Sequence, residues 1–131
     1  MKKQMIITGS LLAALSVALG ALAAHWLKAN ISWAGVQSFD TAVKYQMYHA
    51  LAILIMVALP EKFRVKPYKY AYYAFLVGII LFSGSIYLLS TRELTQINWS
   101  WLGPLTPLGG LSFLAGWILL SIAAFKANEK H

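Results

Sequence analysis

The amino-acid sequence predicts an all-α integral membrane protein, a four-helix bundle that forms one domain over residues 1–131 with both termini in the cytoplasm. Hydrophobic residues make up 60% of the chain and charged residues only 11%, which lies outside the range of soluble domains. Four apolar runs are each close to the ~20 residues that a helix needs to cross a bilayer. Each run is about twice as long as a barrel strand and lacks its alternation, so helices are expected.

The charged residues and the absence of cysteine exclude several classes of protein. The net charge is +7, but the basic residues lie at the ends of the apolar runs, where they act as topology signals and contact anionic lipid headgroups. We therefore expect the lipid bilayer, and not nucleic acid, as the partner. Because the chain has no cysteine, disulfides, thiolate metal sites, iron–sulfur clusters and thiol catalysis are excluded.

The first crossing is expected at about residues 5–25, directly after Lys2 and Lys3. The basic start and the Ala21–Ala23 triplet also suit a secretory signal peptide. The apolar run is longer than the usual ~7–15 residue core of such peptides, which favours a retained helix. Small residues, among them Gly20, recur at three- and four-residue spacing and form a narrow face for close helix packing.

The second crossing is expected at about residues 40–59. Ser32 can cap a helix whose start lies outside the hydrocarbon layer. Asp40 and Lys44 are four residues apart and can pair at the interface. Pro60 then ends the helix.

The third and fourth crossings are expected at about residues 70–90 and 107–125. The third follows the strongest charge cluster of the chain, four basic residues within 61–70. Pro107 suits the first turn of the fourth helix, and Thr106 suits its N-cap.

The basic residues also predict the orientation. The amino end, the loop between the second and third crossings and the polar tail 126–131 hold eight of them, while Lys28, Lys44 and Arg92 lie on the other side. The positive-inside rule therefore predicts that both termini are cytoplasmic. We expect a multi-pass protein of the cytoplasmic (inner) cell membrane.

Helix direction converts sequence position into depth, at ~1.5 Å of rise per residue. By this count the polar residues of the four crossings fall in the outer half of the bundle, away from the termini. They are His25, Tyr45, Gln46, His49, Ser83, Ser85, Tyr87 and Thr106. The inner half is almost wholly apolar, so these residues are expected to form one polar cluster between the helices.

His49 is the centre of this candidate cluster, because it lies ~15 Å from the cytoplasmic edge, near the midplane of a ~30 Å core. An imidazole without partners would be costly there, so it should face other helices. Tyr45, Gln46, Ser83 and Ser85 are its expected neighbours. Two interpretations stay open: a histidine that fixes helix register, and one that binds a ligand, handles protons or holds a cofactor.

The absence of acidic residues within the apolar runs argues against further reaction types for this chain. All four acidic residues lie at the ends of apolar runs or in loops, which disfavours a proton-coupled exporter and paired-carboxylate hydrolysis. Gly109, Gly110 and Gly116 lie in an expected membrane helix and are interpreted as packing sites. We expect no catalytic residue, no metal and no cofactor, although His25 and His49 leave haem or copper ligation open as an alternative.

Four stretches of the chain also carry a family resemblance: Leu19–His25, Thr41–Ala50, Phe82–Tyr87 and Thr106–Trp117. In order, and over nearly the whole chain, they resemble the YgdD-like family of small membrane proteins, whose eukaryotic relatives are TMEM-type proteins. The family pattern ends its first helix with Gly-Ala-Phe-Gly-Ala-His, and this chain has alanine in place of the second glycine. The resemblance implies a four-helix membrane protein without an assigned activity and with a retained first helix.

The sequence therefore predicts a non-enzymatic membrane protein whose outer-half polar cluster packs the bundle and binds a lipid, a small ligand or a partner. Three other functions stay open. The first is an accessory subunit of a larger membrane complex, which small-residue faces and many aromatic residues would suit. The others are a transport or channel unit formed by a homo-oligomer, and a haem- or metal-binding redox protein.

Overall fold

The computed structural model describes residues 1–128, and all regular structure within them is helical. Four helical spans are long and apolar enough to cross a membrane, as the sequence predicts. They are Lys2–Asn30, Trp33–Ala58, Lys66–Ser90 and Ser100–Ala127. Residues 129–131, the end of the predicted polar tail, lie outside the described part of the chain.

The spans are built from α-helices joined by short π-helical and 3-10-helical segments, of which η1 and η3 are π-helical. In chain order the elements are α1 (Lys2–Leu22), η1 (Ala23–Leu27), α2 (Lys28–Asn30), α3 (Trp33–Ala58), η2 (Glu61–Phe63), α4 (Lys66–Gly78), η3 (Ile79–Gly84), α5 (Ser85–Ser90), α6 (Arg92–Thr95), η4 (Ser100–Leu102) and α7 (Leu105–Asn128).

The second span begins earlier than the apolar run that predicts it. α3 starts at Trp33, two turns before Asp40. The reason is the cap, because the Ser32 hydroxyl accepts a hydrogen bond from the Gly35 N–H at 3.2 Å and so satisfies a free donor of the first turn. Asp40 then pairs with Lys44 at 2.9 Å on the helix surface, as predicted.

The other spans also differ from their expected bounds. α7 begins at Leu105, so the expectation that Thr106 is its N-cap is wrong. Thr106 lies in the first turn, and its hydroxyl is instead 2.6 Å from the Ser85 hydroxyl. α1 and α4 begin at Lys2 and Lys66, because basic residues with good helix propensity extend each helix beyond its apolar run.

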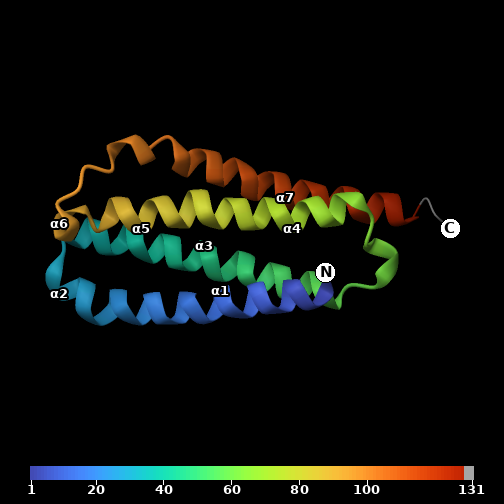
Figure 1. Cartoon of the computed structure of the whole chain (residues 1–131), viewed down its shortest axis with the longest axis horizontal. Helices are drawn as coiled ribbons and strands as arrows, with labels where there is room; N and C mark the ends of the chain where they lie inside the picture. Colours follow the sequence, from blue (N-terminus) through green and yellow to red (C-terminus); the bar gives the residue numbers. More distant parts are fainter. Residues whose placement is uncertain (129–131) are drawn as a thin grey trace.

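The four spans pack with α3 and α4–α5 in the middle (Figure 1). α1 packs on α3, and α7 packs on α4 and η3. The start of α1, the end of α7 and η2 lie at one end of the bundle, while α2 and α6 lie at the other (Figure 1). α3 is the most enclosed helix. In its most apolar stretch, 44% of the residues are buried, compared with 17% in the first span. Its polar residues therefore have protein neighbours on several sides.

Glycines on α7 allow this helix to approach the third span closely. A Cβ added at Gly116 would lie 2.5 Å from the Phe75 ring, and one at Gly109 would lie 2.3 Å from the backbone nitrogen of Phe82. A Cβ at Gly110 would be 4.0 Å from the Phe82 ring, which is an ordinary contact. Close backbone approach matters here because lipid removes the hydrophobic driving force between helices.

Glycines also allow α1 to pack closely on α3. A Cβ at Gly9 would lie 2.9 Å from the Leu54 side chain, so the two backbones approach closely at the end that carries the termini. A Cβ at Gly20 would be 3.4 Å from Val43, a looser contact. The two helices are therefore packed more tightly at Gly9 than at Gly20.

The third span contacts a different neighbour on each side where η3 ends and α5 begins. Ser83 and Ser85 are two residues apart, so they face opposite sides of this span. Ser83 donates a hydrogen bond to the Ala42 carbonyl of α3 at 2.7 Å, whereas Ser85 meets Thr106 of α7. The third span is thus hydrogen-bonded to both of its neighbours within three residues.

We predict that Gly109→Ala lowers the free energy of unfolding by about 1–3 kcal/mol, because its methyl group would overlap the Phe82 backbone and force a shift. Gly110→Ala is the matched control, since its methyl group meets no close neighbour and alanine has the better helix propensity. Thermal unfolding in mild detergent measures both variants. Equal losses for the two would contradict the close contact at Gly109.

Candidate functional site

His49 lies in the middle of α3 and is 5% exposed. Its Nδ1 atom is 2.7 Å from the Tyr45 carbonyl oxygen, one turn earlier in the same helix. Its Nε2 atom is 3.1 Å from Nε1 of Trp117 on α7. A carbonyl only accepts and an indole N–H only donates, so Nδ1 carries the proton and Nε2 accepts. Both ring nitrogens of His49 are therefore engaged by the protein.

Aromatic rings surround the imidazole. The Phe113 ring stacks on it with 3.7 Å between centroids and 9° between planes. The rings of Phe75 and Trp117 lie 5.3 and 5.8 Å away in tilted arrangements. These contacts come from α4 and α7, so His49 is held between three helices.

Trp117 is a hydrogen-bonding neighbour of His49 that the sequence analysis does not predict. The sequence predicts the side chains of Tyr45, Gln46, Ser83 and Ser85 as neighbours of His49, and none of them donates to or accepts from its ring. The positions of His49 and Trp117 along their helices already indicate that the two residues lie at a similar depth. α3 and α7 run in the same direction, with His49 ten and Trp117 eight residues before the expected ends of their helices.

Gln46 forms a second, separate group of hydrogen bonds. Its side-chain nitrogen donates to the Leu12 carbonyl of α1 at 2.9 Å, and its side-chain oxygen accepts from the Tyr87 hydroxyl of α5 at 2.6 Å. This buried amide therefore links three helices, and it uses both of its ends to do so.

Serine hydroxyls form further links. Ser85 contacts the Thr106 hydroxyl at 2.6 Å, and Ser83 donates to α3 as described above. Ser112 on α7 donates to the Ala74 carbonyl of α4 at 2.7 Å. The polar residues thus form several small groups between helices, and the expected single cluster around His49 is wrong. Residues of similar depth face different neighbours because their helices are rotated differently.

His25 lies apart from these groups. It is exposed on η1, and none of the side-chain hydrogen bonds found within residues 1–128 includes it. In the same residues, no three His, Cys, Asp or Glu side chains lie close enough to hold a metal ion. For His49 to ligate haem or copper through Nε2, its hydrogen bond with Trp117 would have to break.

An open groove of about 600 Å³ runs between α3 and α7 beside His49. We call it the aromatic groove. It is lined by Tyr45, His49, Phe82, Pro107, Gly110, Leu111, Phe113, Leu114 and Trp117. Trp117 is 46% exposed, so its ring covers His49 on one side and forms the groove wall on the other. The volume is within the ~300–1,000 Å³ typical of ligand pockets.

The groove offers recognition of apolar groups. His49 and the Trp117 N–H are bonded to each other, which leaves their rings as contact surface. Among the described hydrogen bonds, none involves the Tyr45 hydroxyl. An apolar chain with one polar group near Tyr45 matches these properties.

Comparisons with known proteins agree with the membrane fold. A family described as "Protein of unknown function (DUF423)" matches residues 19–110. The chain is 42% identical over 125 residues to the UPF0382 membrane protein YwdK of Bacillus subtilis. The aligned residues cover 95% of this chain and 98% of the relative.

Two more relatives show the same extent of similarity. The UPF0382 membrane protein SAB0533 of Staphylococcus aureus is 43% identical over 124 residues, with 95% and 97% covered. The UPF0382 inner membrane protein YgdD of Escherichia coli is 35% identical over 127 residues, with 96% and 92% covered. The predicted resemblance to YgdD-like proteins is thereby confirmed. No solved structure is significantly similar to this chain.

We predict that His49→Leu lowers the free energy of unfolding by roughly 1–2 kcal/mol, since the Trp117 N–H would lose its acceptor inside the bundle. His49→Gln should lose less, because a side-chain amide keeps both a donor and an acceptor. Unfolding in detergent measures both.

Tryptophan variants provide the control for this bond. Trp117→Phe should lose stability, whereas Trp101→Phe should not, because Trp101 is exposed at the other end of α7's span. If the two tryptophan variants unfold alike, the hydrogen bond to His49 contributes nothing measurable.

Proposed function

Since the chain belongs to the DUF423 family of unknown function, whose relatives are membrane proteins, we propose that it binds the apolar chain of a lipid or lipid-like molecule in the aromatic groove. It carries out no enzymatic reaction. Its site of action is the bacterial cytoplasmic membrane, in line with the name of YgdD as an inner membrane protein.

One observation carries this proposal: the aromatic groove has an apolar wall whose buried polar atoms are already bonded. The imidazole and indole of the wall satisfy each other. A strongly polar ligand would therefore lose its water contacts without replacement, whereas an apolar chain would lose none. Tyr45, which is part-exposed at the groove, can accept or donate one hydrogen bond to a single polar group.

The rival functions have less support. A transport path through one chain needs a continuous row of polar groups, but Gln46, Ser83 and Ser85 are each bonded within the bundle. Catalysis by a nucleophile would need an adjacent base, and His49 uses both nitrogens elsewhere. An accessory subunit remains a rival through the groove itself, because a partner helix could occupy it.

The proposal includes an orientation with both termini in the cytoplasm. The start of α1 and the end of α7 share one end of the bundle with η2 and its basic neighbours, while α2 and α6 occupy the other (Figure 1). The positive-inside rule favours the more basic end for the cytoplasm. The aromatic groove then opens in the outer half of the bilayer.

Reporter fusions test the orientation. A reporter that is active only in the cytoplasm should be active when fused after Asn128, and inactive when inserted between α6 and η4 at Asn98. The reverse pattern would overturn the orientation but leave the groove proposal in place.

Photolabelling tests the groove. The full-length chain is reconstituted in vesicles that contain a phospholipid with a photoactivatable group in the middle of one acyl chain. We predict that labels concentrate on Leu111, Leu114 and Trp117 of the groove, in preference to Ile55 and Leu15, which are also exposed but lie elsewhere. Mass spectrometry of the digested protein identifies the labelled residues.

A matched pair of variants completes this test. Gly110→Phe fills the groove and should reduce labelling of Leu114, whereas Ala115→Phe adds the same side chain to an exposed position of α7 that does not line it. Uniform labelling of all lipid-facing residues would contradict the proposal.

A further inference from the structure

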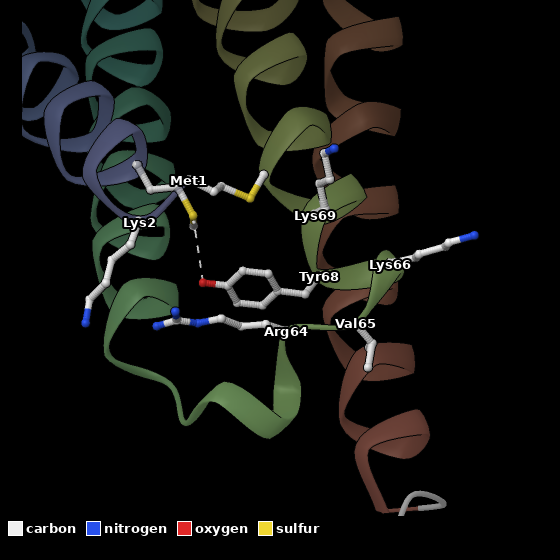
Figure 2. Close-up of a pocket in the computed structure, with 8 residues that line it drawn as sticks. Met1, Lys2, Arg64, Val65, Lys66, Tyr68 and Lys69 are labelled. Carbon is white, nitrogen blue, oxygen red and sulfur yellow. Dashed lines mark hydrogen bonds between the residues drawn. The ribbon is translucent and has the colours of Figure 1, made fainter.

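A second pocket lies at the opposite end of the bundle from α2 and α6, between the start of α1 and the start of α4 (Figure 2). Its volume is about 330 Å³. We call it the basic pocket, because Lys2, Arg64, Lys66 and Lys69 line it and no acidic residue does. Four basic side chains at one pocket at the edge of the membrane-spanning helices create a strong preference for an anion.

Arg64 and Lys2 are the two cations best placed to act together. Their side chains extend toward the same gap, Arg64 from the segment that leads into α4 and Lys2 from α1 (Figure 2). Lys66 and Lys69 belong to α4, and the Lys66 side chain points away from Arg64 and Lys2 (Figure 2). A bound anion would therefore meet charge from two different spans.

Arg64 is held in position by contacts with Val57, Glu61 and Tyr68, and one of its nitrogens, Nε, has no partner among the described residues. Its side chain is 26% exposed, and Nη2 donates to the Val57 carbonyl at 3.2 Å. Nη1 is 3.8 Å from Glu61, whose side chain is 91% exposed, so this ion pair is weak. Nε is buried and has no hydrogen-bond partner in the described protein. A guanidinium has five N–H donors in a planar fork that suits phosphate, so a fixed and unsatisfied one favours a phosphate ligand.

The remaining wall of the basic pocket is apolar. Met5 and Tyr68 are almost fully buried there, and Val65 adds an aliphatic surface. The Tyr68 hydroxyl donates to the Met56 carbonyl at 2.8 Å, so it is already engaged within the protein. A ligand that combines a negative phosphate with an apolar chain fits this wall better than free phosphate does.

We propose that the basic pocket binds the phosphate of an anionic phospholipid headgroup, with the upper part of an acyl chain against Met1, which is exposed, and Val65. Arg64 holds the phosphate through its N–H fork, and Lys2 adds charge from α1. The bound lipid would tie the start of α1 to the start of α4. This site is separate from the aromatic groove, and it does not depend on the function proposed for that groove.

Lipid titration of the purified full-length chain tests this proposal. Binding of phosphatidylglycerol and of zwitterionic phosphatidylcholine is measured by native mass spectrometry in neutral detergent. We expect phosphatidylglycerol to bind more tightly than phosphatidylcholine, and the double variant Arg64→Gln/Lys2→Gln to bind phosphatidylglycerol about tenfold more weakly. Arg64→Lys should fall between the wild type and the double variant, because it keeps the charge but loses the fork.

Lys62→Gln is the matched control. Lys62 belongs to the same basic loop but does not line the pocket, so its loss should leave binding of phosphatidylglycerol nearly unchanged. Helicity and thermal unfolding without added lipid check that each variant is folded. Equal binding of the two lipids, or equal losses for Lys62→Gln and the double variant, would overturn the proposal. Displacement of the lipid by millimolar inorganic phosphate would instead identify a free-phosphate site.

Discussion

Polar side chains inside a bilayer must find hydrogen-bond partners within the protein, and this constraint organises the bundle around α3. Gln46 binds α1 and α5, His49 binds α7, and the Ala42 carbonyl accepts from Ser83 in η3. One helix is therefore hydrogen-bonded to each of the other three spans. Because lipid provides no hydrophobic force between helices, these bonds and the close glycine contacts determine how the helices sit against each other.

The same constraint explains where ligands can bind. Bonds engage the buried side chains of Gln46, His49, Ser83 and Ser85 between helices, so the surface that remains beside His49 is largely apolar. The aromatic groove beside Trp117 is suited to an acyl chain, and the basic pocket around Arg64 is suited to a charged headgroup. The charged pocket thus lies at one end of the helices and the apolar groove in their middle. A bilayer has the same order, with charged headgroups outside its apolar core.

The sequence predicts the fold well because span length, apolar content and depth are one-dimensional properties. It also predicts that His49 is enclosed, since depth sets the cost of leaving an imidazole unpartnered. It does not predict the partner, because that depends on how each helix is rotated about its axis. Ser83 and Ser85 show the difficulty: they lie at a similar depth, but residues two apart face opposite sides of a helix, so one bonds to α3 and the other to α7.

The protonation of His49 tests the central claim most directly, that the protein itself engages this residue. Nitrogen-15 NMR of the protein with labelled histidine, reconstituted in lipid bilayers, distinguishes the two ring nitrogens. His25 and His131 are removed by substitution so that His49 alone is observed. We predict the tautomer with the proton on Nδ1, and an Nε2 signal that changes in Trp117→Phe. A proton on Nε2, or a spectrum that is unchanged in Trp117→Phe, would contradict the account.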